Sequence, residues 1–270
     1  MKLPFTKMSG AGNDFIMMDN REGQIRLTAS QIAWLCDRHR GVGADGLLLV
    51  EPATKGEDYR MRYYNNDGQE AEMCGNGTRC FTRYAHRISG GKQNSLSVET
   101  AAGVIRGTLL GENVEIQMIN PMDYRPPTVL QLEGGPEEVH FLNTGVPHTV
   151  VFVEEIEKVD VHRRGAELRY HTAFTPRGTN VNFVQVLSAD HLCVRTYERG
   201  VEAETLACGT GIVACALLYH LRSASPSPLR VTVRGGDTLK VSFENSPHFR
   251  NVRMLGPADF VFDGEIEIHA

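Results

Sequence analysis

The sequence predicts an α+β protein of two pseudo-symmetric domains that arose by internal duplication, each a mainly antiparallel sheet wrapped around a central helix. Three observations lead to this prediction. Cys-Gly-x-Gly occurs twice, at Cys74 and Cys208, which lie 208 − 74 = 134 residues apart. A histidine follows each cysteine by twelve positions, and other landmarks keep nearly the same offset. Each copy also contains short strand-like runs around one long helix.

The elements of the two copies follow one another in the same order. Each copy opens with a glycine turn and an apolar strand, and continues with a polar-capped stretch that has helical apolar spacing. A second extended run leads through a polar turn to the cysteine, and hairpin-like strands with glycine turns come after the cysteine helix. The first three elements fall at 10–19, 28–39 and 43–51 in the first copy, and at 144–154, 159–171 and 179–187 in the second.

The helices that begin at Gly75 and Gly209 are expected to be the centres of the two domains. Residues 209–220 are apolar on nearly every side, which is typical of a buried helix. Residues 119–129 carry three prolines and fit a linker. We therefore expect domains at 1–118 and 128–270, with the C-terminal strand possibly joined to the first, and the two cysteine loops opposed across a cleft between them.

Composition argues against several classes of function. The net charge of −5 and the pI near 6.1 leave no basic face for nucleic acid. No apolar stretch approaches the length that spans a bilayer, and the N-terminal residues lack the apolar core of a signal peptide. Six cysteines without a C-x-x-C pair indicate reduced thiols in the cytoplasm. Neither a metal site nor a cofactor motif is visible, so a reaction without a cofactor is expected.

Two thiols at helix starts suit one kind of reaction. Inverting a carbon that bears a hydrogen requires a base on one face and an acid on the other. A helix N-terminus lowers the pKa of a cysteine towards neutrality, so a thiolate and a thiol can coexist. Backbone N–H groups of the Gly-x-Gly turns can hold a substrate carboxylate and the charge that spreads onto it.

The motifs together resemble the diaminopimelate epimerase family over essentially the whole chain. They are GAGNDF (10–15), RHRGVGADG (38–46), YNNDG (64–68), MCGNGTRC (73–80), GVPH (145–148), GTNVNF (178–183), YERG (197–200) and ETLACGTG (204–211). The resemblance implies conversion of LL-diaminopimelate to the meso form without a cofactor, on the route to lysine and peptidoglycan. It also suggests a homodimer.

Site residues are carried over from the resemblance one by one. Cys208 matches the base that takes the proton from the LL isomer and Cys74 the acid that returns one, with the roles exchanged in reverse. His148 and Glu198 match residues that assist catalysis beside the thiols. Glu198 also matches a residue that binds the substrate. The other residues that match substrate-binding groups are Asn13, Asn65, Gly75, Asn76, Asn180, Arg199, Gly209 and Thr210.

Two positions depart from the pattern of the family. Gly46 stands where many members have glutamine, and Val146 where many have asparagine before Pro-His. Both changes remove a polar side chain that would be expected near the distal end of the substrate. Specificity for LL-diaminopimelate is therefore less firmly implied than the type of reaction.

Other interpretations remain open. The four cysteines outside the motif pair, Cys36, Cys80, Cys193 and Cys215, are expected in the core, and His86 and His220 are interpreted as structural. A broader amino-acid racemase is the nearest rival, although the proline racemase family has MCGHG where this chain has Asn76. From a different class, the thiols of Cys74 and Cys208 could form a reversible disulfide in a redox or binding protein.

Overall fold

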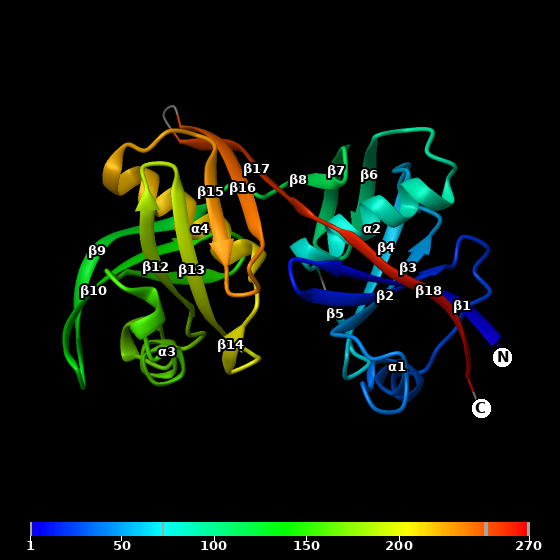
Figure 1. Ribbon diagram of the computed structural model, residues 1–270, viewed down its shortest axis with the longest axis horizontal. Helices are drawn as coiled ribbons and strands as arrows, with labels where there is room; N and C mark the ends of the chain where they lie inside the picture. Colours follow the sequence, from blue (N-terminus) through cyan, green and yellow to red (C-terminus); the bar gives the residue numbers. More distant parts are fainter. Residues whose placement is uncertain (1, 72, 246–247, 269–270) are drawn as a thin grey trace. The chain divides into compact units, whose positions relative to one another are not determined.

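The computed structural model describes residues 2–71, 73–245 and 248–268, and the chain divides into two units (Figure 1). Unit 1 contains Met1–Gln117 and Leu255–Ala270, and unit 2 contains Met118–Met254. The C-terminal residues thus return to the unit in which the chain begins.

Unit 1 is a mixed sheet in the order β18-β1-β2-β3-β4-β6-β7-β8, with β5 added to β4. Only β2–β3 and β4–β6 are parallel among these pairs of described strands. The elements are β1 (Lys2–Gly10), β2 (Asn13–Asp19), α1 (Ala29–Cys36), β3 (Gly46–Glu51), β4 (Tyr59–Asn65), β5 (Glu70–Ala71), α2 (Gly75–Ile88), β6 (Ser95–Thr100), β7 (Gly103–Leu110), β8 (Asn113–Gln117) and β18 (Asp259–Glu267).

Unit 2 repeats this topology in the order β9-β10-β11-β12-β13-β15-β16, with β14 added to β13. Its parallel pairs are β11–β12 and β13–β15. The elements are β9 (Met122–Leu132), β10 (Gly135–Asn143), β11 (Pro147–Phe152), η1 (Ile156–Lys158), α3 (Val161–Arg169), η2 (Thr172–Phe174), β12 (Asn180–Ser188), β13 (His191–Glu198), β14 (Ala203–Thr205), α4 (Gly209–Ser223), β15 (Leu229–Val233), β16 (Thr238–Asn245) and β17 (Phe249–Pro257), which runs across the boundary of the units.

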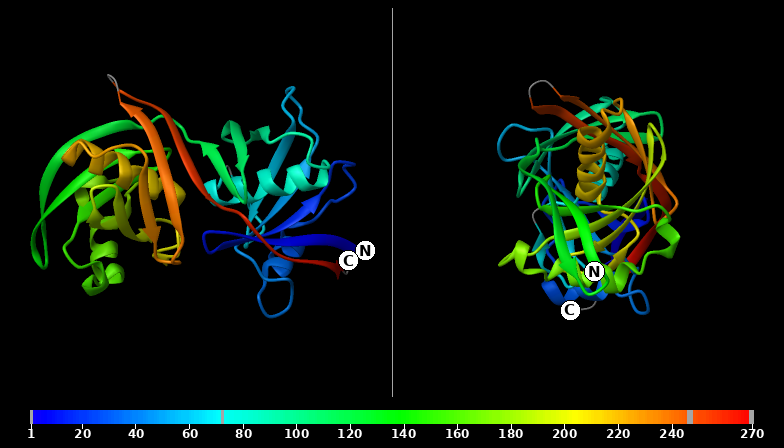
Figure 2. Two further views of the ribbon diagram at one scale, coloured as in Figure 1. Left: turned by 45° about the horizontal axis from the view of Figure 1, so that its top comes forward. Right: turned by 90° about the vertical axis from the view of Figure 1, so that its left-hand side faces the viewer.

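The two cysteine helices are the centres of their units. Each connects a parallel pair of strands, α2 between β4 and β6 and α4 between β13 and β15. Figure 2 shows each helix lying among the strands of its own unit, and both helices contact most of those strands. Residues 211–219 of α4 are all buried, as the apolar sequence predicted. The predicted α+β fold, with a mainly antiparallel sheet around a helix in each copy, is confirmed.

The proline-rich segment 119–129 differs from the linker that was expected, because from Met122 onward it is part of β9. This strand pairs with β10, and the register between them is interrupted at the point where Pro126 and Pro127 lie. Proline has no N–H to donate, so a β-strand tolerates it at an edge or where the ladder is irregular. Proline content alone therefore did not distinguish a linker from a strand of this kind.

The C-terminal strand pairs with the N-terminal strand, which is the arrangement that the sequence left open for the first domain. β18 runs antiparallel to β1 from Lys2–Glu267 to Ser9–Asp259. Arg79 of α2 donates to the carbonyl oxygen of Pro257 at 3.1 Å, and Arg87 donates to Asp263 at 2.8 Å. The division of the chain consequently places this strand with residues 1–117.

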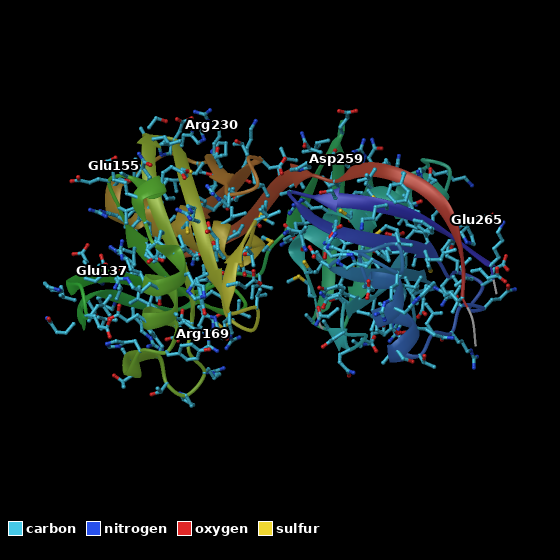
Figure 3. All side chains as sticks on the ribbon, turned by 60° about the horizontal axis from the view of Figure 1, so that its bottom comes forward. Glu137, Glu155, Arg169, Arg230, Asp259 and Glu265 are labelled. Carbon is cyan, nitrogen blue, oxygen red and sulfur yellow. The ribbon has the colours of Figure 1, made fainter. Side chains whose placement is uncertain are left out.

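Several charged side chains lie on the outside of the units, among them Asp259 and Glu265 on unit 1 and Glu155 and Arg230 on unit 2 (Figure 3). On unit 2, Arg169 donates to Glu202 at 3.1 Å and Arg230 donates to Asp190 at 3.2 Å. The Arg230–Asp190 pair is exposed and contributes little to stability, whereas the Arg169–Glu202 pair is partly buried. Within the described residues, no helix combines the length and apolar character that crossing a membrane requires.

Helix α3 lies close to β13, the strand that ends at Glu198. The helix begins after Asp160, whose side chain accepts from the backbone N–H of Arg163. At Gly165, an added Cβ would lie 2.5 Å from the Cβ of Tyr197, so a larger residue could fit only if the helix moved away. The close approach of α3 thus helps to fix the strand that carries Glu198.

We predict that Gly165→Ala lowers the free energy of unfolding by about 1 to 3 kcal/mol, because the methyl group overpacks this contact. Gly134→Ala is the matched control, since nothing lies within 4 Å of the added Cβ there. Urea unfolding followed by circular dichroism measures both variants. Equal midpoints for the two would contradict the packing argument.

Candidate active site

Both motif cysteines are N-cap residues of the central helices. Cys74 has φ −136° and ψ 123° before α2, and Cys208 has φ −122° and ψ 109° before α4. The carbonyl oxygens of Cys74 and Cys208 accept the first helical hydrogen bonds, from Thr78 at 2.8 Å and Ile212 at 2.9 Å. The first N–H groups of a helix have no partner inside it, so each thiol lies beside a cluster of donors. Gly75 and Gly209 are the first helical residues at these two sites.

The second glycine of each motif allows the helix to approach the strands below it. An added Cβ at Gly211 would lie 2.4 Å from Oδ1 of Asn182 and 3.3 Å from Cε1 of His148. An added Cβ at Gly77 would lie 3.3 Å from Cδ1 of Leu48 and 3.4 Å from Cε1 of Phe15. The same place under the helix is therefore polar in unit 2 and apolar in unit 1.

The Cys208 thiol belongs to a hydrogen-bonded group in unit 2. Its sulfur lies 3.6 Å from the hydroxyl oxygen of Thr210, and that hydroxyl lies 2.9 Å from Nε2 of His148. Burial, with a smaller contribution from the charge of Arg199, lowers the pKa of His148 to about 3. His148 is consequently neutral at physiological pH and acts through hydrogen bonds and not through charge.

Asn182 and Thr196 complete this group, and sequence reasoning did not select them. Nδ2 of Asn182 lies 3.2 Å from Nδ1 of His148, and Thr196 donates to Oδ1 of Asn182 at 2.9 Å. Both side chains are buried. Asn182 is the second asparagine of GTNVNF, and a polar residue in an otherwise apolar buried strand was the signal that could have identified it.

Asn180, Glu198 and Arg199 lie together at the ends of β12 and β13. Asn180 accepts from the backbone N–H of Arg199 at 2.8 Å and donates to the carbonyl oxygen of Pro147 at 3.1 Å. It thereby joins the turn after β13 to the start of β11. Glu198 accepts from the hydroxyl of Thr205 at 3.0 Å. Asn180 is buried, and both of these hydrogen bonds are to backbone, so it positions the loop that carries Arg199.

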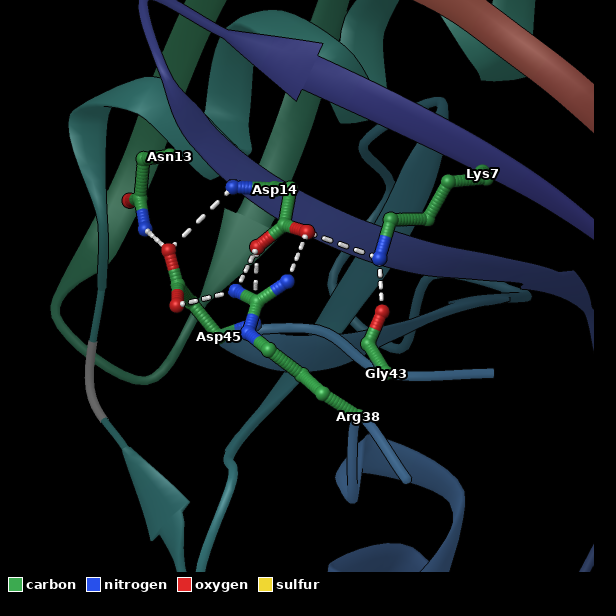
Figure 4. A network of polar contacts seen from close by, with 6 residues as sticks. All are labelled: Lys7, Asn13, Asp14, Arg38, Gly43 and Asp45. Carbon is green, nitrogen blue, oxygen red and sulfur yellow. Dashed lines mark hydrogen bonds and ion pairs between the residues drawn. The ribbon is translucent and has the colours of Figure 1, made fainter. Parts of the chain in front are cut away.

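The Cys74 thiol in unit 1 contacts Asn13 at the start of β2. Its sulfur donates to Oδ1 of Asn13 at 3.5 Å. The amide nitrogen of Asn13 in turn donates to the carboxylate of Asp45 (Figure 4). Because a carboxylate only accepts, this contact fixes which end of the amide faces Cys74.

Asp45 is part of a charge network that includes Lys7, Asp14 and Arg38 (Figure 4). Arg38 forms a bidentate contact with Asp14 at 2.7 and 2.8 Å, and also donates to Asp45 at 2.9 Å. Lys7 lies 2.8 Å from Asp14. Burial alone would raise the pKa of Asp14, but the hydrogen bonds from Arg38 and Lys7 outweigh it and lower that pKa to about 2.

Asn65 and Asn76 have structural contacts in unit 1, Asn65 in the turn after β4 and Asn76 in the first turn of α2. Asn65 ends β4, and its N–H and C=O bond to Gln69 and Gly68, each at 2.9 Å, which closes the turn. Asn76 is buried in the first turn of α2 and accepts from Arg79 at 3.0 Å. The predicted site residues therefore form two groups, one in each unit.

The two departures from the family pattern lie in different settings. Gly46 is buried at the start of β3, where an added Cβ would lie 2.5 Å from the carbonyl oxygen of Tyr64. A glutamine would require this strand pair to separate. Val146 is half-buried and directly precedes β11.

The remaining cysteines and the two helix histidines have structural surroundings. Cys36, Cys80 and Cys215 are buried as predicted, but Cys193 on β13 is only half-buried. Burial raises the pKa of all four thiols, to about 12 for Cys36 and Cys80. Nδ1 of His86 contacts the carbonyl oxygen of Gln93, and Nδ1 of His220 that of Ser225, each at 2.7 Å. Both rings thus bind the chain that follows their helix.

A pocket of about 430 Å³ lies elsewhere in unit 1, beside β3 and β4. Its lining includes Asn20, Arg26, Glu51 and Arg62 but neither Cys74 nor Asn13. Among the described residues, no group of three or more histidine, cysteine or acidic side chains could hold a metal ion. The pocket is therefore separate from the surroundings of Cys74.

Comparison with known proteins agrees with the motifs. The family model described as diaminopimelate epimerase matches residues 5–122 and 140–261. The chain is 42% identical over 278 residues to the diaminopimelate epimerase of Aquifex aeolicus, covering 98% of each chain. It is 41% identical over 266 residues to that of Chlorobaculum tepidum, covering 97% of this chain and 100% of the other.

Solved structures with low identity show the same fold. A phenazine biosynthesis protein of the PhzF family from Bacillus anthracis has a TM-score of 0.74 at 18% identity, over 99% of this chain and 100% of the other. A probable proline racemase from Agrobacterium radiobacter has a TM-score of 0.72 at 16% identity, over 99% and 93%. The identity to the curated relatives over nearly the full length decides the assignment: this chain belongs to the diaminopimelate epimerase family.

Proposed function

We propose that this isomerase converts LL-diaminopimelate to meso-diaminopimelate, with Cys74 and Cys208 as the acid/base pair and without a cofactor. The observation that supports this most directly is that both thiols are N-cap residues of the central helices, one in each copy of the duplicated unit. A duplicated helix-start thiol suits a reaction that needs a proton acceptor and a proton donor at one carbon.

The reaction consists of one proton removal and one proton delivery. The Cys208 thiolate takes the α-hydrogen of the LL isomer as a proton, and the electron pair of the broken C–H bond spreads onto the neighbouring carboxylate. The Cys74 thiol gives its proton to the opposite face of the carbon. The reaction ends with a Cys208 thiol and a Cys74 thiolate, and exchange with water restores the starting forms.

The helix starts supply the groups that make the α-hydrogen acidic enough to remove. We propose that backbone N–H groups at the two helix starts, those of Gly75, Asn76, Gly209 and Thr210, bind the carboxylate at the reacting end. Donors that are already oriented stabilise the charge that develops there at little cost in reorganisation. Arg199 is proposed to bind a substrate carboxylate through its guanidinium group.

Glu198, Asn13, Asn65 and Asn180 have supporting roles in this proposal. Glu198 and Asn13 adjust the protonation of the thiols or bind the substrate amino groups, and Asn65 and Asn180 shape the loops at the two ends of the substrate. A homodimer and a place in the cytoplasm, in the synthesis of lysine and peptidoglycan precursors, are part of the same proposal. The absence of nucleic-acid and membrane partners stays a prediction from composition.

The first test is proton NMR in D₂O under reducing conditions. It follows the loss of α-hydrogen and the stereochemistry of the product for LL-diaminopimelate, proline, hydroxyproline, glutamate and lysine. Exchange confined to diaminopimelate supports the proposal. Exchange of several amino acids would support the broader racemase that Gly46 and Val146 leave open, and no exchange at all would favour the redox or binding alternative.

We predict that Cys74→Ala and Cys208→Ala each reduce epimerisation by about a hundredfold to ten-thousandfold, because each removes one of the two proton-transfer groups. Cys193→Ala is the control, since this half-buried thiol lies on β13 outside the motifs. Turnover is measured by the same NMR method. Full activity in either motif variant would rule out the two-thiol mechanism.

We predict that His148 makes the folded chain sensitive to mild acid. The unfolded chain binds a proton near pH 6.5, whereas folded His148 does so only near pH 3, so the folded state loses stability as the pH falls below 6.5. Between about pH 7.5 and pH 5 the loss is about 2 kcal/mol. Asp14 adds nothing in this window, because its stabilisation is lost only as the pH falls below 3.8 towards 2.

Urea unfolding of the wild type and of His148→Gln at the two pH values measures this loss. The variant should lose about 2 kcal/mol less than the wild type. Burial also lowers the pKa of His140, but this group is present in both proteins and cancels in the comparison. The same loss in both proteins would show that His148 is not held neutral.

We predict that Asp45→Ala lowers kcat/KM by about tenfold, because the amide of Asn13 loses the acceptor that orients it towards Cys74. Asp45→Asn keeps an oxygen that can accept and should retain more activity. Glu22→Ala is the control, as an exposed acidic residue of the same unit whose contact is with Gln24. Unchanged kinetics in Asp45→Ala would show that the network does not orient Asn13.

A further inference from the structure

The two thiols have different hydrogen-bond surroundings, although their backbones are alike. Below the start of α4 lie Asn182 and His148, whereas Leu48 and Phe15 lie at the same place below α2. The polar pair and its partner Thr196 are buried, and buried polar groups must be satisfied by one another. The direction of each hydrogen bond in this group can therefore be worked out.

The Asn182 amide has only one orientation that satisfies its neighbours. Its nitrogen lies 3.1 Å from the carbonyl oxygen of Thr149, which can only accept, so this end must be the NH₂ group. The same nitrogen lies 3.2 Å from Nδ1 of His148 and donates to it. The oxygen end accepts from Thr196 at 2.9 Å.

The orientation of Asn182 determines the tautomer of His148. Because Nδ1 accepts a hydrogen bond, the proton of the neutral ring must be on Nε2. Nε2–H then donates to the hydroxyl oxygen of Thr210, 2.9 Å away. The hydroxyl hydrogen of Thr210 is left to point at the Cys208 sulfur, 3.6 Å away.

We propose that Asn182 is a positioning residue that holds His148 in the Nε2–H tautomer, so that Thr210 donates to Cys208 and favours the thiolate there. In unit 1 the hydrogen bond at the thiol runs in the opposite direction, because the Cys74 sulfur donates to Oδ1 of Asn13. Cys208 is thus prepared as the base and Cys74 as the acid before substrate binds. This inference rests on the proposed function, in which Cys208 is the base that acts on the LL isomer. The enzyme without substrate would then already have the thiolate that the LL isomer needs.

Among the described residues, Arg199 and Cys215 interact electrostatically with members of this hydrogen-bonded group. Arg199 is the charge that acts on His148, and Cys215 on α4 is the titratable group coupled to Cys208. Burial holds the pKa of Cys215 well above its usual range, so this thiol does not ionise with Cys208. A titration near neutral pH therefore reports on the motif thiols.

The test measures the pH midpoint of Cys208 without substrate, from thiolate absorbance near 240 nm. The difference between Cys74→Ser and the double variant with Cys208→Ser isolates Cys208, and the converse pair isolates Cys74. We expect the midpoint of Cys208 to lie below that of Cys74. Equal midpoints, or a lower one for Cys74, would overturn the inference.

Asn182→Asp reverses the proposed orientation with almost no change in shape. The carboxylate places an acceptor beside Nδ1 of His148, so the proton moves to Nδ1 and Thr210 donates to Nε2 instead of to Cys208. The Cys208 midpoint should rise by about one pH unit, which makes the thiolate about tenfold scarcer below the midpoint. The Cys74 midpoint should stay unchanged.

Two controls separate the tautomer from the added charge. Asn180→Asp adds the same charge on the same strand, at a side chain that hydrogen-bonds to the backbone of Pro147 and Arg199, and it should raise the midpoint less. Thr210→Val removes the last donor and should raise the midpoint as Asn182→Asp does, whereas Thr210→Ser should not. Combining Asn182→Asp with Thr210→Val should raise the midpoint beyond that of Thr210→Val by no more than the charge effect seen in Asn180→Asp, because both act through one hydrogen bond.

Long-range ¹H–¹⁵N correlations of histidine-labelled protein identify the tautomer directly. Nε2–H in the wild type and Nδ1–H in Asn182→Asp are expected. Nδ1–H in the wild type, or additive midpoint shifts in the double variant, would refute the role of Asn182. If Asn182→Asp does not fold, Asn182→Leu can be titrated in the same way, since unit 1 has a leucine, Leu48, at this place. Since no substrate is present, these results are independent of whether diaminopimelate is turned over.

Discussion

The surroundings of Cys74 and of Cys208 both depend on one constraint, which is the close approach of each cysteine helix to the strands below it. Gly211 lies so near Asn182 that a single added carbon would come within 2.4 Å of it, and at Gly77 an added carbon would make a tight but longer contact of 3.3 Å with Leu48. The approach sets the thiol at the helix start above the strand residues that determine its hydrogen bonds. It also buries both helices, so the position of the thiol is fixed by the core of the unit and not by a flexible loop.

The duplication supplied the same backbone twice, but the chemistry of the two copies has diverged. In unit 2 the buried residues below the helix form a chain of hydrogen bonds from Thr196 to Cys208. In unit 1 that place is apolar, and the Cys74 thiol is oriented from the side by Asn13 and a network of charges. An epimerase works in both directions, yet in the proposed mechanism each turnover needs one thiolate and one thiol, and the unequal surroundings of the two thiols would provide this difference.

The charge network of unit 1 shows how a remote ion pair can influence a reactive group. Arg38 holds Asp14 and Asp45 at once, and Asp45 accepts from Asn13. Exposed ion pairs such as Arg38–Asp45 add little to stability, but Asp45 determines which end of the Asn13 amide faces the thiol. Position, and not binding energy, is what the network contributes to the site.

The sequence by itself determined the duplication, the central helices, the motif cysteines and the family. These features depend on residue type and spacing: a cysteine before Gly-x-Gly, an apolar helix, and an offset of 134 residues between copies. The tertiary structure alone decided that the C-terminal strand joins unit 1, that the proline-rich segment forms strand β9, and that Asn182 lies below Gly211. Strand pairing and the contacts of buried side chains join residues far apart in the chain, and no local pattern carries that information. For this reason the sequence shows Asn182 within the GTNVNF motif but does not show that its side chain contacts His148.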